Sequence, residues 1–371
     1  MVVENLTQYE HSKLSKKFNF TDGYMHRKLT KAEQSIINDL SKIFKEAERE
    51  QCQQLERDFI KSYFKLARQS VQFDSVQYLF CTSASISLEI VANYLRLHNK
   101  SVTLVEPCID TLVNILRRHK VKLRPLSDQL LDKDSFLENI ERLNSDAICL
   151  VSPNNPTGLE ISRENFIKLT NYCKTKKKIL ILDASCRIFS DPDSIFDHYG
   201  LLARSKANFL VVENTGKVFP TKNLKLSILA VSNNLYQSIY DIHSDFILFT
   251  PPFTIKLLTK FVDLYIKEDL FTVWATIQKN RQSLYEAIDG SFLKPRETQT
   301  SCTAWLELEG ITATKLKSWL ENAGIYVIPG TNLYWSDPKK GERFIRVALN
   351  REPEIFSKAG VILKKVLRRY R

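Results

Sequence analysis

Residues 178–183 read Lys-Ile-Leu-Ile-Leu-Asp, an unbroken aliphatic run that ends in a carboxylate. A run that is apolar at every position fits a strand covered on both faces, as in the parallel sheet of an α/β protein. Burying Asp183 at the end of such a strand costs free energy unless a partner neutralises its charge. The stretch therefore predicts an α/β fold. At the strand end it predicts either a helix N-cap or a carboxylate that pairs with a cationic ligand group.

Similar β-rich runs lie on both sides of this strand, and helix-length segments separate them. They cover residues 78–82, 102–105, 147–151, 209–212 and 226–231. Strands that alternate with helices form a mostly parallel sheet with right-handed crossovers, and ligands bind beyond the carboxyl ends of the strands. We therefore expect Asp183, Ser83 and the turn at residues 153–158 to meet at one edge of the sheet.

The length of 371 residues suits one large domain and a smaller one. We expect an N-terminal arm over residues 1–30 that covers the site, a large domain over residues 31–269 and a smaller α+β domain over residues 270–371. Apolar residues share one stripe along residues 31–70, which predicts a leading helical segment that links to the small domain. Thr30 followed by Glu33 is a capping-box pattern at its start.

The C-terminal domain shows its own pattern of elements. We expect strands over residues 304–308 and 344–349, and helices over residues 274–288, over residues 312–323 and from about residue 353.

Composition argues against several function classes. The net charge of +12 comes largely from scattered lysines, and no nucleic-acid-binding motif accompanies it, so we interpret it as a solvated surface. No apolar run approaches the length that a membrane-spanning helix needs, and residues 1–8 do not resemble a signal peptide. We therefore expect a cytoplasmic protein. The cysteines stand at positions 52, 81, 108, 149, 173, 186 and 302, without a Cys-x-x-Cys pair or metal-like spacing with histidine. They predict buried free thiols and no metal site.

Lys217 follows Thr215 and Gly216 at the end of an apolar run. A lone lysine in this place is usually a surface residue. Glycine, however, lets the backbone approach a ligand closely, and a partly desolvated lysine has a lowered pKa and becomes a usable nucleophile. Upstream, Asn155-Pro-Thr-Gly158 is a tight turn. This turn, the aliphatic run with Asp183 and the Gly-Lys pair together indicate a site for pyridoxal phosphate (PLP). Lys217 would bind its aldehyde, Asp183 its pyridine nitrogen and Asn155 its ring oxygen.

Two further groups suit the ends of such a site. Small residues at Ser83 and Ser85 open a helix, where a phosphate binds well, and Lys225 adds a positive charge; simple N-capping is the alternative. Arg346 lies in the strand over residues 344–349, and its planar guanidinium can donate two parallel hydrogen bonds to a substrate carboxylate. A surface ion pair is the alternative.

At these residues, and over about residues 30–371, the chain resembles the fold-type I PLP enzymes, the aspartate aminotransferase-like superfamily. Within it the chain is more similar to the PLP-dependent L-arginine hydroxylases and oxidases, such as those of enduracididine biosynthesis. This likeness rests on residues 4–10 (Glu-Asn-Leu-Thr-Gln-Tyr-Glu), 21–23 (Thr-Asp-Gly), 152–158, 197–199 (Asp-His-Tyr) and 215–221. It implies a mostly parallel seven-stranded sheet, a homodimer and the use of dioxygen without metal.

The resemblance also implies a role for each matching residue. Those on the cofactor would be Lys217, Asp183, Asn155, Ser83, Ala84, Ser85, Ile109, Ser185 and Lys225. Those on the substrate would be Arg346, Asn155, Asn214, Thr7, Glu10 and Asp22, with Arg346 on its carboxylate and the two acids on its guanidinium. The catalytic group would comprise Lys217, Thr7, Glu10 and Tyr24.

This chain departs from the relatives at four positions. Tyr24 replaces a histidine thought to handle protons during water addition, and tyrosine is a poor general base at neutral pH. Asn214 replaces an aspartate that helps to hold the guanidinium. Ile109 replaces an aromatic residue that stacks on PLP. Cys186 replaces the tyrosine of common aminotransferases, which the oxidases also lack.

We therefore predict an enzyme of natural product biosynthesis that uses PLP and dioxygen to oxidise a cationic L-amino acid, foremost L-arginine. The product would be an unsaturated or hydroxylated 2-oxo acid, with ammonia and peroxide released. A PLP-dependent aminotransferase of a basic amino acid is the first alternative. A non-catalytic protein of the same fold that binds an amino acid is the second.

Overall fold

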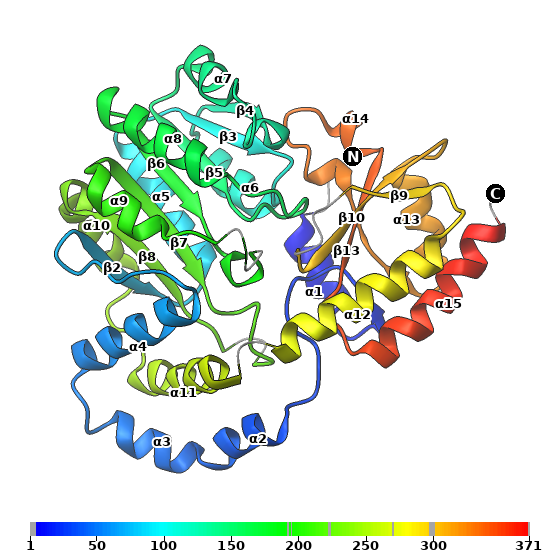
Figure 1. Ribbon diagram of the computed structural model, residues 1–371, viewed down its shortest axis with the longest axis horizontal. Coiled ribbons are helices and arrows are strands. Elements are labelled where there is room, and N and C mark those ends of the chain that lie inside the picture. Colours follow the sequence, from blue (N-terminus) through cyan, green and yellow to red (C-terminus); the bar gives the residue numbers. More distant parts are fainter. Residues whose placement is uncertain are drawn as a thin grey trace.

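The computed structural model describes residues 5–190, 193, 195–221, 224–268, 271–296 and 301–369, with the backbone alone at 271 and 272. Within these residues the strands form a seven-stranded sheet, a four-stranded sheet and a two-stranded sheet (Figure 1). We call the first the large sheet and the second the small sheet. Helices cover both, so the architecture is α/β with a mostly parallel central sheet, as predicted.

The large sheet has the strand order β2-β8-β7-β6-β5-β3-β4. Its strands are β2 (Val76–Cys81), β3 (Val102–Glu106), β4 (Leu123–Ser127), β5 (Ala147–Val151), β6 (Ile179–Asp183), β7 (Asn208–Asn214) and β8 (Ser227–Ser232). Strand β8 runs antiparallel to β2 and β7, and the other neighbouring pairs are parallel. Strand β4 was not predicted from the sequence. Pro125 lies inside it, and its place at the sheet edge is where a strand tolerates proline.

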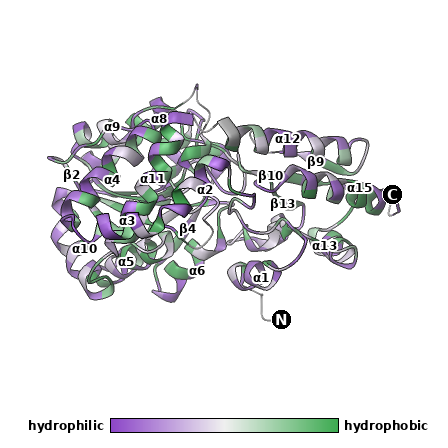
Figure 2. Ribbon diagram, turned by 90° about the horizontal axis from the view of Figure 1, so that it is seen from below, coloured by the Kyte–Doolittle hydropathy of each residue, from purple (hydrophilic) through white to green (hydrophobic). Residues whose placement is uncertain are grey.

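Helices lie on both faces of the large sheet, with α8 and α9 on one side and α5 and α6 on the other (Figure 2). They are α5 (Ala84–Leu97), α6 (Asp110–Arg118), α7 (Phe136–Leu143), α8 (Arg163–Thr175), α9 (His198–Ser205), α10 (Asn233–Phe246) and α11 (Pro252–Glu268), with short turns η1 (Asp128–Leu130) and η2 (Arg187–Phe189). Every residue of β3, β5 and β6 is buried, which explains why these strands are mostly apolar, with the carboxylates of Glu106 and Asp183 at the ends of β3 and β6.

The leading helical segment is not one helix. It consists of α2 (Lys31–Asn38), α3 (Leu40–Ala47) and α4 (Cys52–Leu66), and α11 packs against α3 and α4. The capping box of Thr30 and Glu33 is confirmed. The break between α3 and α4, at residues 48–51, coincides with a wholly polar stretch that has no apolar side chain to bury.

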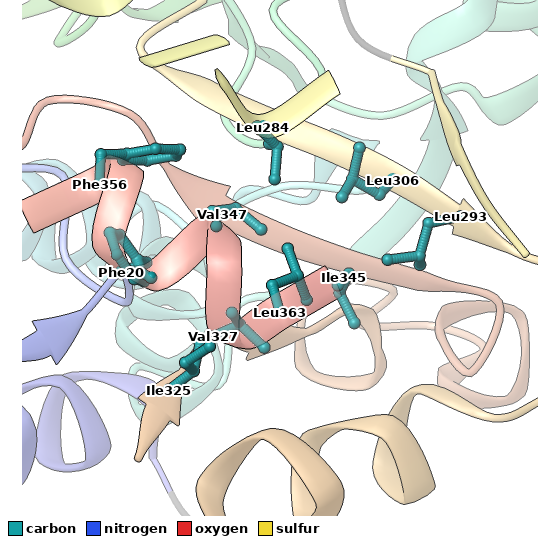
Figure 3. Close-up of a pocket in the computed structure, with 12 residues that line it drawn as sticks. Phe20, Leu284, Leu293, Leu306, Ile325, Val327, Ile345, Val347, Phe356 and Leu363 are labelled. Carbon is teal, nitrogen blue, oxygen red and sulfur yellow. The ribbon is translucent and has the colours of Figure 1, made fainter. Parts of the chain in front are cut away.

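The small sheet has the order β12-β13-β10-β9 and is antiparallel. Its strands are β9 (Leu293–Pro295), β10 (Thr303–Leu308), β12 (Ile328–Pro329) and β13 (Phe344–Ala348), and the accompanying helices are α12 (Phe271–Ile288), α13 (Ala313–Asn322), η3 (Gly330–Asn332), α14 (Pro338–Gly341) and α15 (Pro353–Arg369). Between the sheet and α12 and α15 lies an apolar cavity of about 20 Å³, which Ile345 and Val347 face (Figure 3). Because side chains alternate along a strand, Arg346 between them points to the opposite face of β13.

The N-terminal segment forms a helix, α1 (Leu6–Lys13), and a short strand, β1 (Phe18–Asn19), which pairs with β11 (Ile325–Tyr326). Leu6 and Tyr9 pack into an apolar cluster with Trp305 of the small sheet. The sequence did not predict α1, because so few of its side chains are apolar.

Two negative findings apply to the described part of the chain. It contains no helix with the length and apolarity of a membrane span. It also contains no cluster of side chains suited to a metal ion. The cysteines are free thiols, and all but Cys52 are buried.

Candidate functional site

A cavity of about 250 Å³ lies where the strand ends of the large sheet meet the N-terminal arm and β13. Every residue that the sequence assigned to the site lines it, except Asp22. These residues are Thr7, Glu10, Tyr24, Ser83, Ala84, Ser85, Ile109, Asn155, Asp183, Ser185, Asn214, Lys217, Lys225 and Arg346. Segments from both ends of the chain therefore converge on one pocket.

Lys217 follows β7 and points into this cavity, where its Nζ donates to the Sγ of Cys186 at 3.0 Å. Burial lowers the pKa of its amine, but the negative charges of Cys186 and Asp183 outweigh burial, so the pKa is raised. The expectation of a lowered pKa is therefore wrong for this structure. The reason is Cys186, an anionic neighbour that the sequence analysis did not place beside the lysine.

Asp183 ends β6 and is only 1% exposed. Its Oδ1 accepts a hydrogen bond from the backbone N–H of Ser185 at 2.9 Å, within a turn rather than at an α-helix N-terminus. The N-cap alternative therefore does not describe this carboxylate. The Oγ of Ser185 is buried and has no hydrogen-bond partner within the described residues.

The Asn-Pro-Thr-Gly turn brings Asn155 to the cavity. Asp128 fixes the turn, because one of its oxygens accepts hydrogen bonds from Thr157 Oγ1 at 2.6 Å and Asn154 Nδ2 at 2.8 Å. Burial raises the pKa of Asp128 to about 6. At the end of the turn, Gly158 has a φ of 74°, which favours glycine. The turn thus holds Asn155 facing β13.

The N-terminus of α5 forms another wall. Ser83 caps the helix by accepting from the backbone N–H of Ile86, so the capping alternative is true of this residue, and Ser85 follows in the first turn. Nearby, Lys225 donates from its Nζ to the Oη of Tyr24 at 2.7 Å. The helix N-terminus and the ammonium group together suit a dianionic phosphate.

Arg346 is buried and forms no surface ion pair. Its guanidinium donates to Glu10 Oε1 at 2.9 Å, to Asn155 Oδ1 at 3.1 Å and to the carbonyl of Thr21. Its Nε has no hydrogen-bond partner within the described residues. Burial raises the pKa of Glu10 although the positive charge of Arg346 opposes that effect. The arm therefore places a carboxylate on the arginine that was assigned to the substrate carboxylate.

Asp22 does not line the cavity. It is 1% exposed, and its carboxylate contacts His26 at 2.7 Å and Arg351 at 3.0 Å. Burial opposes ionisation of Asp22, but these two partners lower its pKa to about 2. Arg351, which the sequence analysis did not single out, also donates to the carbonyls of Asn19 and Tyr24. This ion pair fastens the arm to the small sheet.

Sequence reasoning missed an acidic residue of the cavity, Asp110, at the start of α6. Its Oδ2 accepts from the backbone N–H of Leu6 at 3.0 Å, and burial raises the pKa of its carboxyl. Its place next to Ile109, just beyond the end of β3, was the available signal, since ligands bind at this edge. Asn214 uses its Oδ1 to accept from the N–H of Gly216 at 2.9 Å.

The residues present fit PLP. Lys217 and Asp183 stand in one cavity, and the unpartnered hydroxyl of Ser185 lies beside them. The α5 N-terminus and Lys225 line the same cavity and suit the phosphate. A buried hydroxyl without a partner is costly, and a ligand oxygen in the cavity would relieve that cost.

Comparisons with known proteins agree with this reading. The family model for aminotransferase class I and II matches residues 19–356. A solved structure of MppP soaked with the product 2-ketoarginine is 28% identical, with a TM-score of 0.86, and the alignment covers 94% of this chain and 99% of MppP. The aspartate aminotransferase from Thermus thermophilus with maleate, 14% identical with a TM-score of 0.81, covers 99% of this chain and 97% of its own and shows the fold alone.

Among curated proteins, a histidinol-phosphate aminotransferase of Thermoanaerobacter pseudethanolicus is 29% identical over 136 residues. That match covers 34% of this chain and 35% of the relative, so the chain spans about a third of the length of this curated relative.

Proposed function

Because the chain belongs to the aminotransferase class I and II family and is a PLP-dependent enzyme, we propose that it oxidises a cationic L-amino acid with dioxygen. L-arginine is the first candidate. For simple oxidation, one arginine, one dioxygen and one water give the 2-oxo acid, ammonia and hydrogen peroxide. The similarity to MppP over nearly the whole chain supports this proposal, since 2-ketoarginine is the 2-oxo acid of arginine.

The observation that carries the proposal is the pair of carboxylates, Glu10 and Asp110, on the wall of the cavity. A guanidinium has donors in one plane and requires carboxylates to satisfy them. Burial raises the pKa of both acids, which means that both would gain from a cation placed between them. In a chain of net charge +12, these two acids, which line the cavity in addition to Asp183, favour a cationic substrate over an anionic one.

Glu10 also explains how a substrate enters a site whose arginine is already paired. In the proposed sequence the α-carboxylate of the substrate binds Arg346 in place of Glu10, and the free Nε of Arg346 offers it one more hydrogen bond. The released carboxylate of Glu10 then accepts from the guanidinium. The arm thereby closes over a substrate that carries both groups and excludes water from the cavity.

PLP, when bound, supplies an electron sink for the α-carbon of the amino acid. The carboxylate of Asp183 would keep the pyridine nitrogen protonated, and Asn155, with the hydroxyl of Ser185 beside it, would donate to the ring oxygen. Lys217 Nζ would hold the aldehyde of the cofactor, and its amine would serve as the base for the α-proton of the substrate.

Tyr24 supports release of an oxidised product to which no water has been added. Its Oη accepts from Lys225 Nζ, and a phenol is a poor base for activating water. We therefore propose a simple or unsaturated 2-oxo acid as the product, in preference to a hydroxylated one.

Absorption spectra of the holoenzyme with L-arginine, first under argon and then in air, test the proposal. We expect a long-wavelength band that builds under argon and decays only when air is admitted, with the 2-oxo acid appearing at that point. The likeness to histidinol-phosphate aminotransferases favours a plain aminotransferase as the second candidate. That enzyme would convert the cofactor to its amine form under argon and would require a 2-oxo acid acceptor.

The proposal includes the three-part division at residues 30/31 and 269/270 and a homodimer. Exposed apolar side chains after α10, with Leu248 at 82% and Phe249 at 77% exposure, support burial against a second copy. Sedimentation of the wild type and of Leu248→Asp tests this part, with dissociation expected only in the variant.

A further inference from the structure

A buried ion pair lies behind the cofactor side of the cavity. Arg187 belongs to η2, which follows Asp183, and Glu213 belongs to β7, which leads to Lys217. Arg187 Nε donates to Glu213 Oε1 at 2.8 Å, and the two side chains are 2% and 1% exposed. Asn214 lines the cavity and side chains alternate along a strand, so Glu213 points to the opposite face of β7. The ion pair thus joins the segment after Asp183 to the strand before Lys217.

Three segments of the chain hold the carboxylate of Glu213. Besides Arg187, Tyr199 of α9 donates from its Oη to Oε1 at 3.0 Å, and Tyr63 of α4 donates from its Oη to Oε2 at 3.3 Å. Both tyrosines are buried. Because hydrogen bonds are directional, donors on both oxygens fix the position and the orientation of the carboxylate. They therefore also fix the strand that carries it.

The backbone of Glu213 is held as well. Its carbonyl accepts from Ser227 Oγ of β8 at 2.6 Å, and Ser227 Oγ lies 2.8 Å from Ser87 Oγ of α5. Because Ser227 uses its proton on the carbonyl, Ser87 is the donor in the second contact. Glu213 is therefore linked to the helix whose N-terminus suits the phosphate, in addition to the segments that carry Asp183 and Lys217.

Residues 197–199 (Asp-His-Tyr), to which the proposed function gives no role, brace this ion pair. His198 Nδ1 lies 2.9 Å from Arg187 Nη1 and accepts from it, because a guanidinium can only donate. Tyr199 donates to the carboxylate of the pair. Asp197 is the N-cap of α9, the helix that carries the other two side chains. The motif thus supports both members of the ion pair.

Stability alone does not explain an ion pair that is buried so deeply. Taking two charges out of water is costly, and apolar side chains of similar volume often stabilise a fold at least as well. What the pair adds is a fixed geometry. We propose that Glu213, held by Arg187, is a positioning residue for PLP that sets the place of Asp183 relative to Lys217 and to the N-terminus of α5. This inference rests on the proposed roles of Asp183 and Lys217, but not on dioxygen or on which amino acid is oxidised.

A second buried carboxylate of the same kind provides a matched control. Glu33 is 1% exposed and accepts from Arg27 Nη2 at 2.7 Å and from Tyr265 Oη at 2.6 Å. These three residues join the end of the arm to α2 and α11, and they are not among the residues that line the cavity. Removing the charge of Glu33 should therefore cost stability without moving the groups that hold PLP.

Equilibrium dialysis of the holoenzyme against graded PLP tests the proposal in Glu213→Gln and Glu33→Gln. Glutamine keeps the volume of the side chain but loses the charge that its donors require. We expect the Kd for PLP to rise about tenfold or more in Glu213→Gln and to stay at the wild-type value in Glu33→Gln. Urea unfolding records the loss of stability in both variants, which a purely structural role would also produce.

Tyr199→Phe and Tyr265→Phe repeat the comparison with one hydrogen bond removed, and they decide the matter if a glutamine variant fails to fold. We expect the Kd for PLP to rise only in Tyr199→Phe. An unchanged Kd in the folded variants of Glu213 and Tyr199, or an equal rise in the control variants, would overturn the proposal. A wild type that binds PLP on Lys217 but does not oxidise arginine would contradict the proposed function and leave the role of Glu213 standing.

Discussion

The two sides of the cavity are built in different ways. The cofactor side comes from the strand ends of one sheet, where short local motifs place Asp183, Asn155 and Lys217. The substrate side is assembled from the arm, α6 and β13, and the pair that joins Glu10 to Arg346 spans 336 residues of sequence. The difference teaches that the contacts proposed for the cofactor are encoded locally, whereas those proposed for the substrate depend on segments that meet only after folding.

The largest expected effect lies on the cofactor side. Lys217→Ala removes the amine that we propose binds PLP covalently and takes the α-proton, so we expect activity to fall by about 10⁴-fold or more. Borohydride reduction followed by mass spectrometry should find a pyridoxyl group on Lys217 in the wild type and none in the variant. A variant that keeps both the covalent adduct and its activity would show that another lysine holds the cofactor.

The next effect lies on the substrate side. Arg346→Lys keeps the charge but loses the planar fork, and we expect kcat/KM for L-arginine to fall about 100-fold. PLP binding, followed by absorbance, should stay unchanged because the cofactor side is intact. Loss of PLP binding together with activity would show that Arg346 does not act on the substrate side alone.

Glu10→Gln tests the recognition of the cation. We expect kcat/KM for L-arginine to fall by about tenfold, because the variant removes a charge-assisted hydrogen bond. L-citrulline has a similar shape without the charge, so its kcat/KM should fall much less in this variant. An equal fall in kcat/KM for both substrates would mean that Glu10 organises the arm but does not recognise the charge of the substrate.

The pH dependence of KM for L-arginine also tests the role of Glu10. The pKa of Glu10 is raised above its ordinary value of 4.5, and only the ionised carboxylate attracts the guanidinium. We therefore expect KM for L-arginine to rise as the pH falls, beginning above pH 4.5, and Glu10→Gln to flatten this rise. A wild-type KM that stays constant down to that pH would contradict the role of Glu10.

The smallest effect concerns the attachment of the arm. The pKa of Asp22 is lowered from 3.8 to about 2, which corresponds to about 2 kcal/mol of stability. Because the pKa is depressed, this contribution is present above pH 3.8 and is lost as the pH falls through about 2. Urea unfolding of Asp22→Asn at pH 7 should show a loss of about 2 kcal/mol.

Asp58→Asn is the control for this prediction. Asp58 forms an exposed pair with Lys61 at 3.7 Å, and such pairs contribute little. Equal losses in Asp22→Asn and Asp58→Asn would show that the buried ion pair to Arg351 does not stabilise the fold.

The sequence brought the residues proposed for the cofactor side together, because most of them follow an apolar strand or open a helix, and in the structure they line one cavity. It did not predict the direction of the pKa of Lys217, since that depends on Cys186, whose contact with the lysine arises from the folded geometry. Asp110 was missed although its place beyond the end of β3 was a signal, and its contact with the arm arises only on folding. The Asp22–Arg351 ion pair joins segments near the two ends of the chain, and no local sequence pattern predicts it.

Oxygen uptake by the purified holoenzyme on addition of L-arginine tests the central claim most directly, with mass analysis of the product in the same sample. The account predicts arginine-dependent oxygen consumption, formation of the 2-oxo acid and release of peroxide without any added 2-oxo acid acceptor. No oxygen consumption beyond a blank, with turnover only when an acceptor is supplied, would contradict it.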